Sequence, residues 1–418
     1  RRLLLAGIGV LLIALGYWYW NFGRMPKTIP PLSRQEPSSY QATGPVPMVI
    51  THFDDVTQVT NFEITPDGKY MLVATLPGTV WIYHKVDGNF VRQKVPFFAV
   101  TTSQPGWPPQ EAGLTGLVLG VDFEKSGDVF LIYSFAKEKR SFRNRITRVK
   151  FTNRLGQVLG ASPQKIFEAN TPGTGSHQIQ DGVGVMVKDT PSILFTVGEG
   201  FVAARALKPE EEAGKLMLIT RDGTSVPGAR PFPQSPKVQA LGIRNAPGMA
   251  RNAENGNIMI ADTGPNNYDR LLYGKLFDAQ GNNDKKLSFL WDGTEASLTK
   301  PIPNAYDEDR DSGLHRFVPT QTAVSMVFID SAKLPTLGEK QQYVLVTLFG
   351  RTGEPGNDPG KRIELGKISH EEKGNTISLT PFIGRVSGVA DKLGHPIGLA
   401  FDAETGVIYF GDIIEGRI

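Results

Sequence analysis

From about residue 48 to the end, short apolar runs alternate with polar turns in a pattern that recurs six times. Each unit begins with a turn rich in Asp, Asn, Gly or Pro, continues as a run of β-branched and aromatic residues, and ends in a small or acidic residue. Short runs bounded by turn residues predict β-strands rather than helices. The six units are PDGKYMLVAT (66–75), KSGDVFLIYS (125–134), DTPSILFTVGEG (189–200), ENGNIMIADTG (254–264), KQQYVLVTLFG (340–350) and ETGVIYFGD (404–412).

The spacing of these units predicts a ring of sheets. Their turns follow one another at intervals of 59, 64, 65, 86 and 64 residues, so one interval is longer by about twenty. A unit of about 62 residues holds a four-stranded sheet with its connections, and sheets repeated around an axis leave few free edges. We therefore expect an all-β protein, a six-bladed β-propeller over residues 48–418 with an inserted loop around 270–315. A pair of β-sandwiches is the alternative.

The N-terminal region has a different pattern. Residues 3–20 form an unbroken apolar and aromatic run, preceded by two arginines. A helix of this length reaches about 27 Å and can cross a bilayer core, and the arginines favour a cytoplasmic N-terminus. We therefore expect residues 1–23 to form one transmembrane anchor and the rest to be exported, with a signal peptide cleaved near Ala14–Gly16 as the alternative. Residues 24–47 are rich in Pro and are expected to form an extended linker.

Composition narrows the class of protein. The 418 residues include 45 Lys and Arg and 42 Asp and Glu, a formal net charge of +3 without a basic block, which argues against a nucleic-acid partner. Cys is absent, which excludes disulfides, thiolate metal sites and Cys nucleophiles. Any redox chemistry therefore needs a cofactor that is bound without Cys.

Three polar clusters flank the predicted strands. His177, in a loop rich in Gly, Ser and Gln, is a candidate general base, with a solvent-exposed loop histidine as the alternative. Arg244 and Asn245 combine a permanent cation with an amide and can bind a carboxylate or a quinone oxygen, unless they only stabilise a turn. The Gly264–Pro265 turn and Asp269 offer carbonyl and carboxylate oxygens that suit Ca²⁺, although such turns are common without a metal.

Several segments, in the same order, resemble the glucose/sorbosone dehydrogenase family. These are soluble aldose dehydrogenases that use pyrroloquinoline quinone (PQQ) on a six-bladed propeller. The resemblance runs from about residue 56 to 418. The segments that carry it are AGLTGLVLGVDF (112–123), the His177 loop leading into TVGEG (196–200), GKLMLITRDG (214–223), and GIRNAPGMA followed by IADTGPNN (242–267).

The resemblance implies roles for individual residues. His177 matches the base that takes the proton of the sugar C1 hydroxyl while hydride passes to the quinone. Glu199 stands where an acidic residue orients that histidine, and it is one methylene longer than the usual Asp. The Arg244–Asn245 pair matches the residues that contact the quinone. The Gly264–Pro265 turn matches the backbone carbonyls that hold the Ca²⁺ polarising the quinone.

The cations that would neutralise the three PQQ carboxylates are not matched. Phe349 stands at the position of the family's Lys, with Arg351 two residues further on. His395 and Ile397 stand where the family has arginines. Because three buried carboxylates need cationic partners, Arg351 and His395 are the candidates to bind the cofactor in their place.

Two functions therefore remain open. The first is a membrane-anchored periplasmic dehydrogenase that oxidises a small sugar with PQQ and Ca²⁺ and passes electrons to an external acceptor. The second is a propeller that has lost its cofactor and serves as a structural or docking subunit of a larger respiratory or photosynthetic membrane complex. In both, the N-terminal helix attaches the chain to the inner membrane and the propeller lies on the periplasmic side.

Overall fold

The chain divides into two units, residues 1–37 and 38–418. The predicted anchor 1–23 and most of the predicted linker 24–47 lie outside the described residues. Within the described ranges, no helix has the length and apolar character needed to cross a membrane. The computed structural model describes residues 40–44, 46–102, 111–138, 141–172, 175–277, 282–283, 286–300, 314–330, 332, 337, 341–350, 360–371, 374–385 and 394–418.

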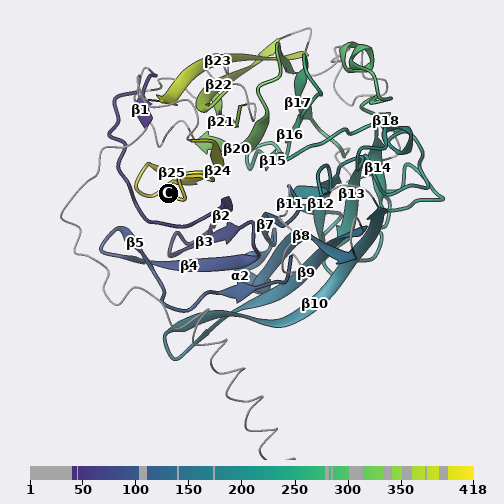
Figure 1. Ribbon diagram of the computed structural model, residues 1–418. Helices are drawn as coiled ribbons and strands as arrows, with labels where there is room; N and C mark the ends of the chain where they lie inside the picture. The colour runs from purple at the N-terminus through teal and green to yellow at the C-terminus, as the bar shows by residue number, and fades with distance from the viewer. Residues whose placement is uncertain are drawn as a thin grey trace, which may run out of the picture. The chain divides into compact units, whose positions relative to one another are not determined.

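Six sheets, numbered here in chain order, form the second unit, and the first three include its longest strands (Figure 1). Sheet 1 contains β2 (Val59–Ile64), β3 (Tyr70–Thr75), β4 (Thr79–Val86), β5 (Asn89–Arg92) and β6 (Phe98–Ala99). Sheet 2 contains β7 (Leu114–Leu119), β8 (Asp128–Glu138), β9 (Ser141–Arg154) and β10 (Gln157–Pro172), with the short helix α2 (Phe123–Ser126) before β8. Sheet 3 contains β11 (Ile179–Val187), β12 (Thr190–Val197), β13 (Lys215–Thr220), β14 (Val238–Leu241) and β18 (Leu287–Ser288), with the 3-10 turn η1 (Ala203–Arg205) after β12.

The remaining sheets complete the unit. Sheet 4 contains β15 (Gly248–Arg251), β16 (Ile258–Asp262), β17 (Asp269–Gly274) and β19 (His315–Phe317), with the 3-10 turn η2 (Glu295–Thr299) between the last two. Sheet 5 contains β20 (Ala323–Asp330), β21 (Gln342–Leu348), β22 (Arg362–Glu371), β23 (Gly374–Arg385) and, from the start of the described chain, β1 (Tyr40–Ala42). Sheet 6 has two strands, β24 (Pro396–Asp402) and β25 (Val407–Asp412).

The six repeated sequence units coincide with the second strands of the six sheets, β3, β8, β12, β16, β21 and β25. Among them, β16 is buried along its whole length, and β12 and β21 are buried over most of it. These strands read as continuous apolar runs because neighbouring sheets cover both of their faces.

The first strands of successive sheets contact each other in a closed ring, β2, β7, β11, β15, β20, β24 and again β2. Six separate apolar clusters fill the six spaces between neighbouring sheets, including the space between sheets 6 and 1. The prediction of an all-β propeller is confirmed, with five sheets of four or five strands and a sixth position held by the two-stranded sheet.

The two ends of the second unit meet beside sheet 6. The Phe53 N–H donates to the Ile418 carbonyl at 2.8 Å, and the Ile418 N–H donates to the Asp54 carbonyl at 2.9 Å. The Asp412 N–H donates to the Arg417 carbonyl at 2.8 Å, so the end of the chain also pairs with β25. Early and late segments therefore share one set of backbone hydrogen bonds, which fastens the ring at this point.

The expected inserted loop at 270–315 has different bounds. β17 occupies Asp269–Gly274 and is the third strand of sheet 4, so the irregular stretch begins after Gly274. Arg270 interrupts the apolar pattern of this strand, yet it is fully buried because its Nη2 donates to Asp262 at 2.5 Å. Within the insertion, β18 pairs in parallel with β14 and joins sheet 3.

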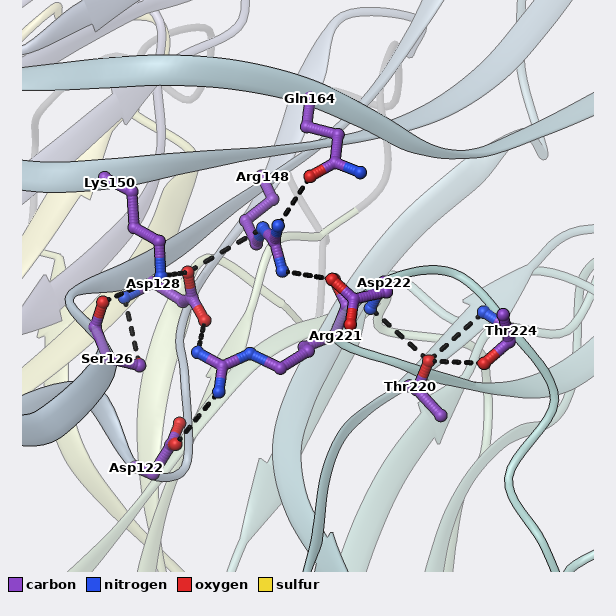
Figure 2. A network of polar contacts seen from close by, with 10 residues as sticks. All are labelled: Asp122, Ser126, Asp128, Arg148, Lys150, Gln164, Thr220, Arg221, Asp222 and Thr224. Atoms are coloured by element: carbon purple, nitrogen blue, oxygen red, sulfur yellow. Dashed lines mark hydrogen bonds and ion pairs between the residues drawn. The ribbon is translucent and has the colours of Figure 1, made fainter.

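A network of charges links sheets 2 and 3 (Figure 2). Asp128 on β8 is only 1% exposed and lies 2.6 Å from Lys150 Nζ, and it also accepts a hydrogen bond from Arg221, which follows β13. Arg148 reaches from β9 to Asp222 at 2.7 Å. These polar contacts thus join β8 and β9 of sheet 2 to the turn after β13 of sheet 3, in addition to the apolar interface between the two sheets.

Candidate active site

A cavity of about 520 Å³ lies at one end of the ring of first strands. Its walls carry hydroxyl and amide side chains from the first strands, among them Asn61, Thr115, Gln180 and Ser325. Such groups bind hydroxyl-rich or quinone ligands through hydrogen bonds. Of the candidate catalytic, cofactor-binding and metal-binding residues, those that line this cavity are His177, Arg244, Asn245, Gly264 and Pro265.

His177 and Glu199 form a buried pair beside this cavity. Nδ1 of His177 lies 2.8 Å from Oε1 of Glu199, and both side chains are at most 5% exposed. Because a carboxylate accepts hydrogen bonds, the contact places the ring proton on Nδ1 and leaves Nε2 as the acceptor of the neutral imidazole. Oε2 of Glu199 is buried without a hydrogen-bond partner in the described part of the chain. The pair has the arrangement of an oriented general base.

The backbone around this pair requires glycine. Gly198 N–H donates to the Gln178 carbonyl at 2.9 Å, and Gly200 N–H donates to the His177 carbonyl at 3.0 Å. A Cβ on Gly198 would lie 2.5 Å from the His177 carbonyl oxygen, which no side chain tolerates. Gly198 therefore allows the loop after β12 to approach the loop before β11 closely enough to bring Glu199 to His177.

Arg244 and Asn245 are held by the last residue of β16. Oδ1 of Asp262 accepts both backbone N–H groups, each at 3.0 Å. Arg244 Nη1 donates to the Thr263 carbonyl at 2.8 Å, and within the described residues no carboxylate lies at ion-pair distance from the guanidinium. Burial lowers the pKa of Arg244, while the charge of Asp262 opposes this. The cavity therefore contains a partly buried cation that suits an anionic or carbonyl ligand.

The Gly264–Pro265 turn lines the cavity, but Asp269 does not. The carboxylate of Asp269 accepts hydrogen bonds from the backbone of Gly264 at 2.9 Å and of Gln321 and Thr322 at 2.6 Å, and from the Thr320 hydroxyl. Burial raises the pKa of Asp269, and these hydrogen bonds oppose the rise. Contrary to the expected role as a metal ligand, Asp269 connects the 264 turn to the 320–322 loop, because its oxygens are already engaged.

His395 is also placed beside the cavity rather than in it. Its ring stacks on Phe349, with centroids 4.3 Å apart, and Nδ1 donates to the Phe349 carbonyl at 2.7 Å. Phe349 and Ile397 line the cavity, whereas His395 lies behind Phe349. The expectation that His395 contacts a cofactor directly therefore does not match its position, and Arg351 lies outside the described residues.

Glu111 is a cavity residue that the sequence did not point out. Its Oε2 accepts the backbone N–H of His177 at 3.1 Å and the side-chain amide of Asn245 at 3.4 Å. An isolated Glu before a strand has no pattern that distinguishes it from a solvent-exposed residue. The only available signal was its position immediately before the AGLTGLVLGVDF segment.

A second cavity, of about 380 Å³, is lined by residues that continue along the same first strands. Asn61 and Ser325 line both cavities. Burial raises the pKa of Asp181 to about 7, and burial together with the Asp181 charge raises that of Glu63 to about 8. The axis of the ring therefore contains two carboxyl groups that ionise unusually late.

The groups that line the cavity meet part of the binding needs of PQQ and Ca²⁺. Arg244 and Asn245 suit a quinone oxygen or one carboxylate, and backbone carbonyls of the Gly264–Pro265 turn suit Ca²⁺. Among described residues, no cluster of three or more His, Cys, Asp or Glu side chains could hold a metal, so carbonyl groups would have to supply the ligands. The described lining fits the quinone end of PQQ.

The fold is a propeller, and one cavity is lined by His177, which is paired with Glu199, and by Arg244 and Asn245. The model of the glucose/sorbosone dehydrogenase family matches residues 57–342, more than half of the sequence, and the chain belongs to this family. The predicted family is thereby confirmed. A search of curated proteins finds no match.

Solved structures share the fold at low identity. The PQQ-bound aldose sugar dehydrogenase of Streptomyces coelicolor aligns with a TM-score of 0.57 and 17% identity, covering 87% of this chain and 89% of that chain. The apo form of the soluble aldose sugar dehydrogenase of Escherichia coli gives 0.62 and 15%, covering 88% and 96%. The PQQ domain of Coprinopsis cinerea pyranose dehydrogenase gives 0.60 and 12%, covering 88% and 93%. At these identities the likeness shows a common propeller fold.

Proposed function

We propose that this protein is a six-bladed, PQQ- and Ca²⁺-dependent aldose dehydrogenase, in which β24 and β25 form the sixth blade. The observation that carries the proposal is that one cavity gathers an imidazole oriented by Glu199 and a guanidinium that has no carboxylate partner among the described residues. Membership of the glucose/sorbosone dehydrogenase family supports the same reaction class. The hydroxyl and amide lining suits a sugar, which offers a donor and an acceptor at each carbon.

The residues have complementary roles in this reaction. His177 Nε2 takes the proton of the sugar C1 hydroxyl, and Glu199 stabilises the imidazolium that forms. Arg244 and Asn245 would hold the quinone oxygens or a carboxylate of the cofactor, and the carbonyls of the Gly264–Pro265 turn would hold Ca²⁺. Bound PQQ would supply the acceptor for the C1 hydride. The sugar thereby loses one proton and one hydride and becomes the lactone.

A specific observation favours a second candidate function, that of a propeller without cofactor in a membrane complex. The positions where the family's cations are expected carry the stacked pair of Phe349 and His395. The described lining has Arg244 as its cation, whereas PQQ has three carboxylates. Loss of the cofactor would leave an interaction module with the same fold.

Reconstitution tests the two candidates directly. Purified protein is incubated with PQQ and Ca²⁺, and reduction of a redox dye is followed with a panel of aldoses. The first candidate requires sugar-dependent turnover that is lost in His177→Ala and retained in the surface control His370→Ala. Absence of both turnover and a PQQ-dependent absorbance change would contradict the first candidate and favour the second.

Attachment to the inner membrane, with the propeller in the periplasm, is part of the proposal and rests on the apolar run at 3–20. Fractionation of cells and protease treatment of spheroplasts test it. The expected result is a membrane-bound chain whose propeller is digested from outside. Recovery of the intact chain in the soluble periplasmic fraction would instead support the cleaved signal peptide.

A further inference from the structure

An aromatic ring covers one face of the candidate base. Phe201, from the loop after β12, stacks on His177 with ring centroids 4.0 Å apart and an interplanar angle of 15°. Phe201 itself is 56% exposed, whereas His177 is 4% exposed. A large apolar side chain on the surface therefore separates the imidazole from solvent on that face.

Both residues of this stack have an unfavourable backbone conformation. His177 has a φ of 54° and Phe201 a φ of 61°, in the left-handed region that bulky side chains rarely adopt. Two hydrogen bonds maintain it, from Gly200 N–H to the His177 carbonyl at 3.0 Å and from Val202 N–H to the Glu199 carbonyl at 3.1 Å. Such strain persists where the surroundings determine it, and it concentrates at functional sites.

The loop that carries Phe201 is hydrogen-bonded to a lysine of β13. Lys215 on β13 is fully buried, and its Nζ donates to the carbonyls of Arg205 at 2.8 Å, Ala206 at 3.0 Å and Ala213 at 2.6 Å. All three acceptors belong to the 199–213 loop. Lys215 thus connects both ends of the segment between residues 205 and 213, which follows Phe201, to β13.

We propose that Phe201 is a positioning residue that fixes the ring plane of His177 and excludes water from one of its faces. With Nδ1 bonded to Glu199 and one face covered, His177 meets the cavity through its remaining edge, which includes Nε2. The inference rests on the proposed function only in assigning His177 as the base. The stack and its effect on the ring require neither sugar nor cofactor.

The first test reads the ring directly by NMR of protein labelled with ¹⁵N in its histidines. The Nδ1–H signal of His177, assigned by its absence in His177→Ala, is followed in Phe201→Ala, Phe201→Gly and Phe201→Tyr. In Phe201→Ala and Phe201→Gly we expect this proton to exchange with water at least about tenfold faster, while Phe201→Tyr retains the wild-type rate. Glycine adopts the positive φ without strain, so equal loss in both variants assigns the effect to the ring.

Leu207→Ala is the matched control, because Leu207 is another exposed apolar residue of the same loop, at 40%. Its His177 signal and the melting temperature are expected to equal those of the wild type. The proposal would be overturned if the Nδ1 proton of His177 exchanged with water at the wild-type rate in Phe201→Ala. It would also be overturned if Phe201→Gly restored the wild-type exchange rate.

The second test separates this inference from the proposed function. In the reconstituted dye assay, Phe201→Ala is expected to lower kcat about tenfold with little change in KM, because misorientation of a base affects the chemical step. A wild-type protein without turnover contradicts the proposed function, while the NMR result still decides on Phe201. A Phe201→Ala enzyme with wild-type kcat contradicts the positioning role.

Discussion

His177 and Glu199 lie across from each other, two residues beyond the last paired residues of β11 and β12. The register pairs Ile179 with Val197, and extension by two residues on each strand pairs 177 with 199. The 2.8 Å contact between Nδ1 and Oε1 is therefore a consequence of hairpin register. The hairpin supplies the orientation that a general base needs.

Glu199→Gln should lower kcat by roughly 10²–10⁴-fold, because an amide can neither fix the Nδ1–H tautomer nor stabilise the imidazolium. Glu199→Asp shortens the side chain by one methylene and should lower kcat less, since the carboxylate is retained. KM should change little in either variant. Steady-state dye reduction at saturating PQQ and Ca²⁺ measures both constants, and a Glu199→Gln enzyme with wild-type kcat would remove Glu199 from the mechanism.

Arg244→Met should weaken PQQ binding at least about 30-fold, because it removes the charge-assisted contacts of a guanidinium for which the described part of the chain supplies no ion-pair partner. Arg244→Lys keeps the charge but not the planar group, so an intermediate affinity is expected. Equilibrium titration of PQQ absorbance gives the dissociation constants. Arg230→Met, at an exposed arginine, is the control, and equal affinity of the Arg244→Met and control proteins would contradict the assignment.

Asp262→Asn should reduce the free energy of unfolding by about 3–5 kcal/mol, because it leaves the fully buried Arg270 without its counter-charge. Asparagine keeps one acceptor oxygen for the backbone of Arg244 and Asn245, but its NH₂ group then faces Arg270, so the variant removes both the charge and the acceptor of this pair. Asp222→Asn, at the exposed partner of Arg148 in Figure 2, should cost less than about 1 kcal/mol. Chemical denaturation compares the three proteins, and equal losses would show that the Asp262–Arg270 pair is not critical.

Glu63→Gln should stabilise the protein at alkaline pH. The pKa of Glu63 is raised on folding to about 8 by burial and by the charge of Asp181, so the folded state binds the proton more tightly than the unfolded state. Below about pH 4 both states are protonated and the carboxyl costs nothing. Between about pH 4 and 8 the ionisation of Glu63 lowers the free energy of unfolding of the wild type, and above pH 8 this loss stays constant.

The expected gain of Glu63→Gln is therefore near zero at pH 4 and about 1–3 kcal/mol at pH 8.5. Denaturant titrations across this range measure it. Glu254→Gln, at an exposed glutamate, should show no gain at either pH. A pH-independent difference between Glu63→Gln and the wild type would indicate a packing effect in place of ionisation.

The repeats allowed the fold to be predicted from the sequence, because a strand buried on both faces must be apolar along its whole length. This signal located β12, β16 and β21, but it missed β17. There Arg270 occupies an interior position, where Asp262 and the Phe289 carbonyl are its partners. A charged residue within an apolar run is predicted to be exposed, unless the residue that forms an ion pair with it is known.

The candidate site was predictable to a similar extent. Loop residues such as His177 and Arg244 stood out by residue type and by their place before predicted strands, and the cavity does gather them. Asp269 had the right chemistry for a metal, but its neighbours from the 320–322 loop occupy its oxygens. His395 stood at a family position, yet its ring turns toward Phe349.

The order of apolar runs and turns by itself determined that this chain forms many short strands repeated around an axis. The reason is that a buried strand needs apolar residues within its own short segment. Which groups face one another depends on register and on contacts between residues tens of positions apart. The sequence could not assign Glu111 to the backbone of His177, nor Phe201 to its ring face. Contact between neighbouring sheets places Glu111, before β7, at the backbone of His177, and the pairing of β11 with β12 places Phe201 at the ring of His177.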